Sequence, residues 1–310
     1  MPLGRTRPPP AHGGDSMTAG RAAAFSHVRL TVVGSLNVDL TARVETLPRP
    51  GETIGGGVLS REAGGKGANQ AAAAARLGAS VRMIGAVGRD DAGSFLVKTL
   101  TDAGVDTTGI RTTDASPTGT ALITVARDGE NQIAVCAGAN DEVTVTREDL
   151  QDTTCVLLQF EIPQHVVHAA CASTNGFVAI NAAPATVMSA ELLSRADLVI
   201  VNDSEARQLP EVLGATMLAI THGAAGATLY RNGVKIAEAP ARRAIATNTV
   251  GAGDAFCAAL TVALAGGVHP AEALTVATEA GAAAAEDLQS QPLLERWEVY
   301  RARALDRVRR

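Results

Sequence analysis

Short apolar runs alternate along the chain with longer Ala- and Leu-rich segments. The run RLTVVG at 29–34 is rich in β-branched residues and ends in glycine, which is typical of a buried strand that feeds a loop. Comparable runs follow at 81–88, 155–160, 176–181, 197–202 and 216–221. The segments at 68–77, 92–103 and 252–265 predict helices. This alternation predicts an α/β fold with a mostly parallel sheet that is covered by helices on both faces.

Two segments depart from this alternation. Residues 41–61 are rich in turn-forming residues, and 119–136 alternate in polarity around Asp128-Gly129, a strong hairpin signal. We interpret them as a half-exposed antiparallel sheet inserted into the α/β core, a β-sheet lid formed by about 41–62 and 118–138. A sheet that merely extends one edge of the core is the alternative.

The two ends of the chain differ in character. Residues 1–27 are rich in Pro, Gly, Arg and Ala without an apolar signal region, so we expect a disordered leader before a single domain over 28–310. At the other end, Trp297, Tyr300, Ala304, Leu305 and Val308 recur at helical spacing. They predict an amphipathic helix that packs one face on the core.

Composition excludes several classes of partner. The net charge is −5, so the chain carries no basic field for nucleic acid or for an anionic membrane. No apolar run reaches the ~18 residues of a spanning helix. Its four cysteines have neither CxxC nor metal-type spacing, so we expect buried free thiols and a cytoplasmic location.

The most informative segment is NTVGAGDAF at 248–256, which precedes an apolar helix. Glycines let backbone N–H groups turn toward an anion, and the helix N-terminus adds a partial positive charge. Gly251, Ala252 and Gly253 therefore predict a phosphate or oxyanion hole with the carboxylate of Asp254 at its mouth. A plain helix cap is the alternative role for Asp254. The sequence has no GxxxxGK[ST] motif.

Polar residues at other strand ends form a second group. Lys66, one of only three lysines among 27 basic residues, lies in the Gly-rich segment AGGKGANQ, where a compact ammonium suits a polyol site. Asn37 and Asp39 are two apart in an extended stretch and so point the same way. Glu161, 202–205 and 221–223 also follow strands. Because ligands bind at the carboxyl ends of parallel strands, we expect these groups to converge.

Together these motifs resemble those of the ribokinase/PfkB-type sugar kinases. The resemblance covers roughly Arg29 to the C-terminus, and its motifs, in the family's order, are GSLNVD, PGETI, GGKGANQA, GEN followed by AGAN, FEIP, NAAPA, NxxE (202–205), THGAAG and GAGDAF. GAGD with NxxE is typical of the superfamily, and GGKGANQA indicates the ribokinases within it.

The resemblance implies a ribokinase-like fold and ATP-dependent phosphorylation of D-ribose at its 5-hydroxyl, giving ribose 5-phosphate and ADP. Asp254 would be the catalytic base, and the backbone of Gly251, Ala252 and Gly253 would hold the transferred phosphoryl group. Besides Asp254, the residues implied to bind the sugar are Asn37, Asp39, Gly65, Lys66, Gly67, Asn69 and Glu161. Those implied to bind ATP are Asn202, Thr221, His222, Gly223, Gly226 and Gly253. Glu205 would place Mg²⁺ through water.

The sequence departs from the family near its monovalent-cation site. Asn248 stands where the family usually has Asp, and the loop at 286–291 that normally supplies backbone ligands is shortened. A K⁺ site at Asn248 and Val250 would therefore lack a charge, and we expect K⁺ dependence to be weak or absent. The segment 206–220 is also short, which predicts a stunted peripheral helix. We expect His222 to face solvent.

Two other functions remain open. The chain could be a kinase for another small sugar or a nucleoside, or a non-catalytic member that binds sugar or nucleotide. The expected partners are small molecules, with no nucleic acid and no membrane. The exposed edge of the 119–136 hairpin also allows a homodimer through the lid.

Overall fold

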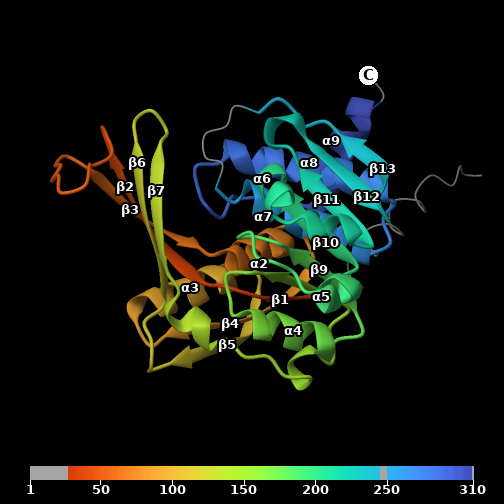
Figure 1. The fold of residues 1–310 in the computed structure, drawn as a ribbon, viewed down its shortest axis with the longest axis horizontal. Helices are drawn as coiled ribbons and strands as arrows, with labels where there is room; N and C mark the ends of the chain where they lie inside the picture. Colours follow the sequence, from red (N-terminus) through yellow and green to blue (C-terminus); the bar gives the residue numbers. More distant parts are fainter. Residues whose placement is uncertain (1–26, 245–249, 309–310) are drawn as a thin grey trace, which may run out of the picture.

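A computed structural model describes residues 27–244 and 250–308 of the protein. Except for His27, the expected leader at 1–27 lies outside the described residues, as does Asn248. In Figure 1 a layered body carries the C-terminal half of the chain and most helices, and a narrow sheet projects from one side of it.

The body is built on a large twisted sheet. Within the described residues it has nine strands, in the order β13 (Val234–Ala239), β12 (Ala227–Arg231), β11 (Met217–Thr221), β10 (Leu198–Asn202), β9 (Phe177–Asn181), β8 (Cys155–Gln159), β1 (Arg29–Val33), β4 (Ser80–Gly88) and β5 (Asp106–Thr113). All neighbours from β5 to β11 pair in parallel, and only β12 and β13 add antiparallel pairs. The predicted mostly parallel sheet is confirmed.

Helices cover both faces of this sheet. They are α2 (Lys66–Leu77), α3 (Asp91–Asp102), α4 (Gln164–Ser173), α5 (Ala190–Arg195), α6 (Asp203–Gln208), α7 (Ala252–Ala265), α8 (Pro270–Glu286) and α9 (Trp297–Val308). Side chains alternate along β1, so Val32 belongs to the core cluster that contains residues of α2, α7 and α8, and Val33 belongs to the cluster with residues of α4 and α5. Burial on both faces explains why the strands are continuous apolar runs.

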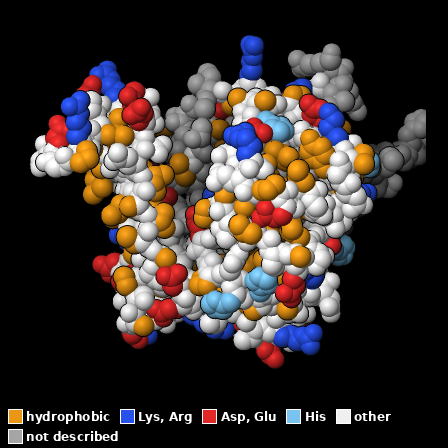
Figure 2. Space-filling view, viewed as in Figure 1, with side chains coloured by type: hydrophobic (Ala, Val, Ile, Leu, Met, Phe, Trp, Pro, Cys, Tyr) orange, Lys and Arg blue, Asp and Glu red, His pale blue; other side chains and the backbone are white. Residues whose placement is uncertain are grey.

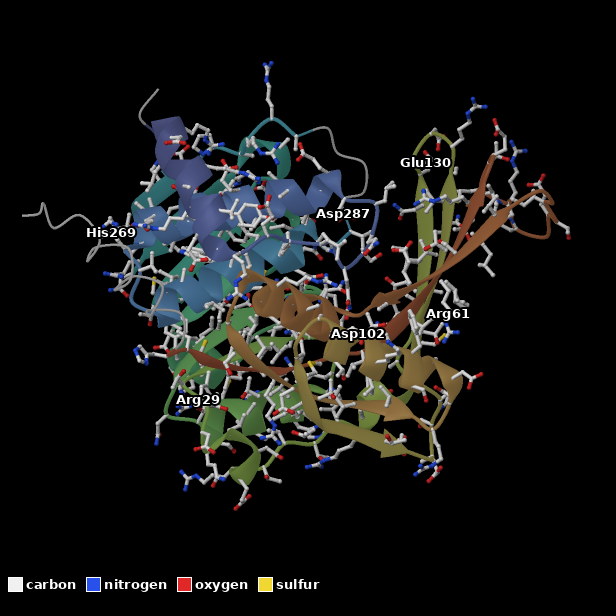
Figure 3. The ribbon with its side chains drawn as sticks, turned by 180° about the vertical axis from the view of Figure 1, so that it is seen from behind. Arg29, Arg61, Asp102, Glu130, His269 and Asp287 are labelled. Carbon is white, nitrogen blue, oxygen red and sulfur yellow. The ribbon has the colours of Figure 1, made fainter. Side chains whose placement is uncertain are left out.

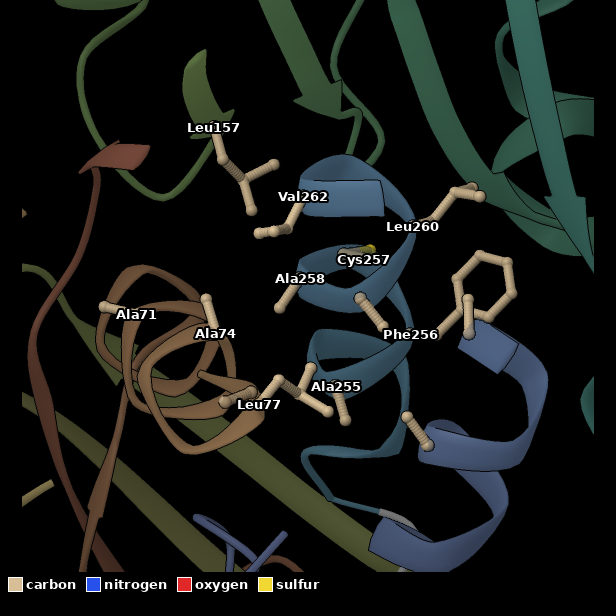
Figure 4. Packing of buried hydrophobic residues seen from close by; sticks show 14 of the residues in the cluster. Ala71, Ala74, Leu77, Leu157, Ala255, Phe256, Cys257, Ala258, Leu260 and Val262 are labelled. Carbon is tan, nitrogen blue, oxygen red and sulfur yellow. The ribbon is translucent and has the colours of Figure 1, made fainter. Parts of the chain in front are cut away.

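Alanine brings two helices that bear site residues close together. Ala74 of α2 lies on the side toward α7, where Ala255 and Ala258 are found, and all three are buried (Figure 4). Small side chains let the two helix backbones approach, which places the first turn of α2 beside the first turn of α7. Helix α7 begins and ends at the predicted residues, and α2 begins two residues before its predicted start.

The projecting sheet, here called the lid, has the strand order β3 (Val58–Gly64), β2 (Asn37–Val44), β6 (Gly119–Ala126) and β7 (Asn131–Cys136). The prediction that it is antiparallel was wrong at its centre, because β2 pairs with β6 in parallel. Between these two strands the chain passes through α2, β4, α3 and β5, and such a crossover returns it in the same direction. The lid starts at Asn37, ahead of the expected position near 41.

Three smaller expectations need correction or detail. In α9, Trp297, Tyr300 and Ala304 are buried, but Leu305 is exposed, because the next helical position turns away from the core. Cys136 is an exposed free thiol on the lid edge, and the other three cysteines are buried. The segment after Glu205 holds only the end of α6 and a 3-10 turn at Pro210–Gly214. No described helix is long and apolar enough to cross a membrane.

Candidate active site

A cavity of about 330 Å³ lies between the carboxyl ends of the body strands and the inner face of the lid. In the space-filling view a hollow separates the lid from the body (Figure 2). Most of the predicted site residues line this cavity, namely Asn37, Asp39, Gly65, Lys66, Asn69, Glu161, Asn202, Glu205, Thr221, Val250, Gly251, Gly253 and Asp254. Strand ends from distant parts of the sequence meet here because parallel strands end at the same edge.

The turn before α7 borders the cavity through Gly251 and Gly253. Gly251 has φ +81°, and a Cβ at this position would lie 2.3 Å from the carbonyl oxygen of Ser290, so only glycine fits. The amide of Ala255 donates to the Gly251 carbonyl at 2.8 Å, as the first hydrogen bond of the helix. The preceding amides have no acceptor within the helix and lie at its positive end, which suits an anion. A Cβ at Gly253 would meet no atom within 4 Å.

Asp254 is buried in the first turn of α7, with 8% of its surface exposed. Its Oδ2 accepts a hydrogen bond from Nδ2 of Asn69 at 3.1 Å, and its Oδ1 accepts one from Nε2 of Gln70 at 2.9 Å. Both donors come from α2, and the cap of α7 is Gly251, so Asp254 is not a plain helix cap. Burial raises the pKa of Asp254, and Lys66 and the two amides oppose that rise. The hydrogen bonds from Asn69 and Gln70 hold the carboxylate in a fixed orientation.

A buried amide network extends behind Asp254. Nε2 of Gln70 also lies 3.1 Å from Oδ1 of Asn181, and Oε1 of Gln70 accepts from Nε2 of Gln159 at 2.6 Å. Gln70, Gln159 and Asn181 were not among the predicted site residues. A signal was available, because Gln159 and Asn181 are polar residues at the carboxyl ends of apolar strands, and Gln70 precedes a run of alanines in α2. Such a network orients the carboxylate, and Asn181 also lines the cavity.

The first strand of the lid supplies two polar groups of the site. Oδ1 of Asn37 accepts from Nδ2 of Asn140 at 2.8 Å, and Oδ1 of Asn140 accepts from the amide of Leu36 at the same distance. Asn140 was also missed, although it lies in the quoted AGAN motif. Burial, reinforced by the charges of Glu161, Glu62 and Asp254, raises the pKa of Asp39 to about 7. Asp39 thus titrates near neutral pH.

Glu161 and Lys66 complete the polar side of the cavity, here called the polar wall, whose other side chains are Asn37, Asp39 and Asn69. Oε2 of Glu161 accepts from the hydroxyl of Ser35 at 2.6 Å and from the amide of Lys66 at 3.0 Å. Burial lowers the pKa of the Lys66 ammonium, but the charges of Asp254 and Glu161 outweigh it and the net shift is upward. Oδ1 of Asn69 is buried with no hydrogen-bond partner among the described residues, although it belongs to a cavity-lining side chain. It is suited to accept from a ligand hydroxyl.

At the other end of the cavity, α6 begins with a reciprocal cap. The amide of Glu205 donates to Oδ1 of Asn202 and the amide of Asn202 donates to Oε2 of Glu205, each at 2.8 Å. His222 does not face solvent as expected. Its Nδ1 lies 2.7 Å from Oδ1 of Asp203 and its Nε2 lies 3.0 Å from the hydroxyl of Thr228. The ring therefore ties the loop after β11 to the N-terminus of α6.

Some predicted site residues do not line the cavity. These are Gly67, Ala252, His222, Gly223 and Gly226. Gly67 packs beneath the site, where a Cβ would lie 2.6 Å from the backbone of Gly34 and Ser35. Gly226 has φ +113° and a Cβ there would lie 2.1 Å from the carbonyl of Ala239. Both glycines allow close backbone packing.

The donor set suits a magnesium ion bound with a nucleotide. Within residues 27–244 and 250–308, no cluster of three or more His, Cys, Asp or Glu side chains could hold a metal alone. Mg²⁺ usually keeps several waters and binds one or two carboxylates together with substrate phosphates. Glu205 meets that requirement, since it lines the cavity and its capping contact fixes the carboxylate.

Comparison with known proteins agrees with this geometry. Residues 28–297 match the model of the pfkB family carbohydrate kinases. The chain belongs to this family. Among curated pfkB-type relatives, the ribokinase of Haemophilus influenzae is 38% identical over 261 residues, which cover 76% of this chain and 85% of the relative. The Bacillus subtilis ribokinase is 37% identical over 267 residues, covering 81% and 90%.

The family fold is also found among solved structures. The structure of Arabidopsis thaliana ribokinase complexed with ribose and ATP superposes with a TM-score of 0.80 at 28% identity. The match covers 90% of this chain and 98% of that one. The pfkB fold of this chain, with its separate lid sheet, is therefore the fold of the ribokinases.

Proposed function

We propose that this pfkB-family protein is a ribokinase, which transfers the γ-phosphoryl group of ATP to the 5-hydroxyl of D-ribose and releases ribose 5-phosphate and ADP. One observation carries the proposal. The carboxylate of Asp254 is buried and fixed by Asn69 and Gln70, and it borders one cavity with both the Gly251–Gly253 turn and the polar wall. Relatives named ribokinase over most of their length support the choice of substrate.

Asp254 takes the proton of the attacking hydroxyl in this mechanism. A positioned base contributes roughly 10²- to 10⁴-fold to a rate. The amides of Ala252 and Gly253 and the positive end of α7 stabilise the charge on the transferred group, and phosphoryl transfer depends mostly on such positioning and charge stabilisation. Closure of the lid over the cavity would exclude water that competes as nucleophile.

The polar wall binds the acceptor, and the opposite end binds the nucleotide. Asn37, Asp39, Lys66, Asn69 and Glu161 offer charged and amide groups to sugar hydroxyls, with Gly65 exposing its backbone. Asn202 and Thr221 border the nucleotide, and the loop with His222, Gly223 and Gly226 shapes that end. Glu205 would hold Mg²⁺ through water, and the bound ion would neutralise phosphate charge.

A second acceptor class is supported by the lid. Ala121, Ile123, Ile133 and Val135 give the cavity an apolar wall on the lid, beside Asp39. Such a wall could cover the base of a nucleoside or a deoxygenated sugar. We therefore keep another small sugar or a nucleoside as the alternative acceptor.

We further propose that K⁺ has little effect on this enzyme. Nη1 of Arg76 donates to the carbonyls of Gln291 and Pro292, each at 2.7 Å. Two backbone oxygens of the shortened loop thus already bind a cationic side chain. Of the residues implied for K⁺, Val250 lines the cavity and Asn248 lies outside the described residues.

A homodimer through the lid is also part of the proposal. Val58, Leu59, Leu122, Ile133 and Val135 are exposed apolar side chains of the lid, and β7 is an unpaired edge strand there. Exposed edges and apolar patches of this kind are typical of interfaces. We propose a cytoplasmic location, because the described cysteines are free thiols.

The discriminating experiment is a coupled ADP-release assay over a panel of pentoses, hexoses and nucleosides. We expect ribose to give the highest kcat/KM. A nucleoside or deoxyribose preference would establish the alternative acceptor. Absence of turnover with every acceptor, together with measurable ribose or ATP binding, would establish a non-catalytic binding protein.

A further inference from the structure

A single carboxylate connects the lid to the loop that follows α8. Oε2 of Glu62, on β3, accepts hydrogen bonds from both the amide and the hydroxyl of Ser290, each at 2.9 Å. The two residues are 228 positions apart in the sequence. Seen from behind, this loop, labelled at Asp287, lies on the side of the body that faces the lid (Figure 3). Bonds to an ionised acceptor are roughly twice as strong as neutral ones.

Ser290 in turn supports the phosphoryl-binding turn. Its carbonyl oxygen is the atom nearest to the position that a Cβ of Gly251 would occupy, at 2.3 Å. Gly251 caps α7, which carries Asp254. A shift of Ser290 would therefore be transmitted to the backbone that lies around the transferred group, because packed backbones have no room to absorb it.

The loop has two anchors of different kinds. Arg76 of α2 binds its carbonyls at Gln291 and Pro292, and α2 belongs to the rigid body. Glu62 binds Ser290 from the lid. Between these anchors the side chain of Gln291 is buried with neither polar atom hydrogen-bonded among the described residues. On the lid side, Glu62 supplies two hydrogen bonds to this loop.

Glu62 also borders the acceptor side of the site. It is directly paired with Asp39 across the β2–β3 ladder, and two residues later Gly64 leaves the space that the Asp39 carboxyl fills. Helix α2, with Lys66, follows immediately. One strand therefore joins the sugar-binding groups to the loop behind the phosphoryl-binding turn.

We propose that Glu62 is a positioning residue that fastens the lid to the 287–293 loop and thereby sets the Gly251–Gly253 turn for phosphoryl transfer. Glu62 touches neither reacting group, so its effect falls on the transition state more than on sugar binding. The proposal rests on the proposed kinase function and adds a coupling between the sugar-binding groups and the phosphoryl-binding turn.

Three variants and a matched control test this role. Glu62→Ala removes the acceptor, Glu62→Gln removes the charge but keeps an acceptor oxygen, and Ser290→Ala removes one of the two donors. Glu45→Gln is the control, since Glu45 is an exposed lid carboxylate paired with Arg127. Far-UV circular dichroism and thermal melting establish that each variant is folded.

At pH 8.5, where Asp39 is ionised with or without the charge of Glu62, Glu62→Ala should lower kcat about tenfold, less than the roughly 100-fold that a 1 Å misplacement can cost, with ribose KM within about twofold. The kcat of Glu62→Gln should be close to the wild-type value. The kcat of Ser290→Ala should lie between the values of the two Glu62 variants. In hydrogen exchange, the Ser290 amide should exchange roughly tenfold faster in Glu62→Ala and stay protected in Glu62→Gln.

The outcomes separate this proposal from the kinase assignment. If Glu62→Ala matches Glu45→Gln in kcat and in exchange at Ser290, or if Glu62→Gln is as impaired as Glu62→Ala, the positioning role is wrong. If Glu62→Ala does not fold, the comparison of Ser290→Ala and Glu62→Gln with the control decides. An inactive wild-type protein would overturn the kinase function instead, and the exchange data would then still decide whether the contact holds the loop.

Discussion

Nε2 of Gln70, near the start of α2, donates a hydrogen bond at 2.9 Å to Oδ1 of Asp254, in the first turn of α7, and both side chains are buried. The bond joins the two glycine-led helices that frame the site. It fixes the carboxylate from behind while Asn69 holds its other oxygen. Catalytic geometry here thus depends on the close packing of two alanine faces.

Replacing Asp254 by Asn should abolish most turnover. The amide cannot take the hydroxyl proton, so we expect kcat to fall by roughly 10²- to 10⁴-fold, while the ribose Kd from calorimetry changes little. Asp102→Asn, at an exposed position paired with Lys98, should leave both constants unchanged. Near-normal turnover by Asp254→Asn would remove this residue from the mechanism.

Gln70 should influence how kcat depends on pH. Its amide favours the ionised form of Asp254 and so holds down a pKa that burial raises. Gln70→Leu removes this donor, so the pKa of Asp254 rises and the acidic limb of the kcat profile moves to higher pH, with kcat reduced roughly tenfold. An unchanged acidic limb in steady-state assays from pH 5 to 9 would contradict this.

Ribose affinity should weaken as pH falls through the pKa of Asp39, about 7. The ionised carboxylate accepts hydrogen bonds from sugar hydroxyls better than the protonated carboxyl group does, and the charges of Glu161, Glu62 and Asp254 favour protonation of Asp39. Calorimetric titration from pH 5.5 to 8.5 should show this trend in the wild-type protein and in Asp102→Asn. Asp39→Asn should bind weakly with a flatter profile, and a wild-type Kd that is constant over this range would refute the assignment.

The stability of the free protein should follow the opposite trend. Because the pKa of Asp39 is raised in the folded state, this state binds the proton more tightly than the unfolded chain does. The contribution of Asp39 to the free energy of unfolding therefore decreases as pH rises from about 4 to about 7. Asp39→Asn should remove that part of the pH dependence in urea titrations.

Loss of His222 should weaken the nucleotide site selectively. The ring bridges Asp203 and Thr228, so His222→Ala frees the loop after β11 from α6. We expect the KM for ATP to rise roughly tenfold from two lost hydrogen bonds, with ribose Kd unchanged. His165→Ala, on the exposed face of α4, is the control. An equal rise in that control, or no rise in His222→Ala, would exclude this role.

Potassium should change the rate little. Raising K⁺ from zero to 100 mM with tetramethylammonium keeping ionic strength constant should alter kcat by less than about twofold, because Arg76 already occupies two loop carbonyls. Arg76→Ala, if folded, should gain K⁺ dependence as those carbonyls are released. A large activation of the wild-type protein would show that a complete cation site forms.

Local chemistry made part of the site predictable. GAGDAF specifies a turn, a helix start and a buried carboxylate within a few residues, and α7 begins at Ala252 as the pattern indicates. Glu161 follows the end of β8, as parallel pairing predicts, and period-two alternation predicts that Asn37 and Asp39 point the same way, although both open the lid strand β2. These signals are short-range, so no knowledge of distant partners is required.

Other contacts had no such signal. The partners of Asp254, the bridge from His222 to Asp203 and Thr228, and the contact of Glu62 with Ser290 join side chains on different elements. A sequence pattern reports whether a position faces inward, but not which polar atom it meets. The same holds for the lid, where alternation predicted strands and not the parallel pairing of β2 with β6.

The sequence by itself determined the parallel sheet, the two glycine-led helix starts and the residue types of the sugar and phosphoryl sites, because periodicity and backbone conformation act locally. Only the tertiary structure decided how the carboxylates are oriented, that Asp39 titrates near neutral pH and that the lid is tied to the loop behind Gly251. Those properties depend on burial, on the charges nearby and on the packing of helices and strands that are far apart in the chain.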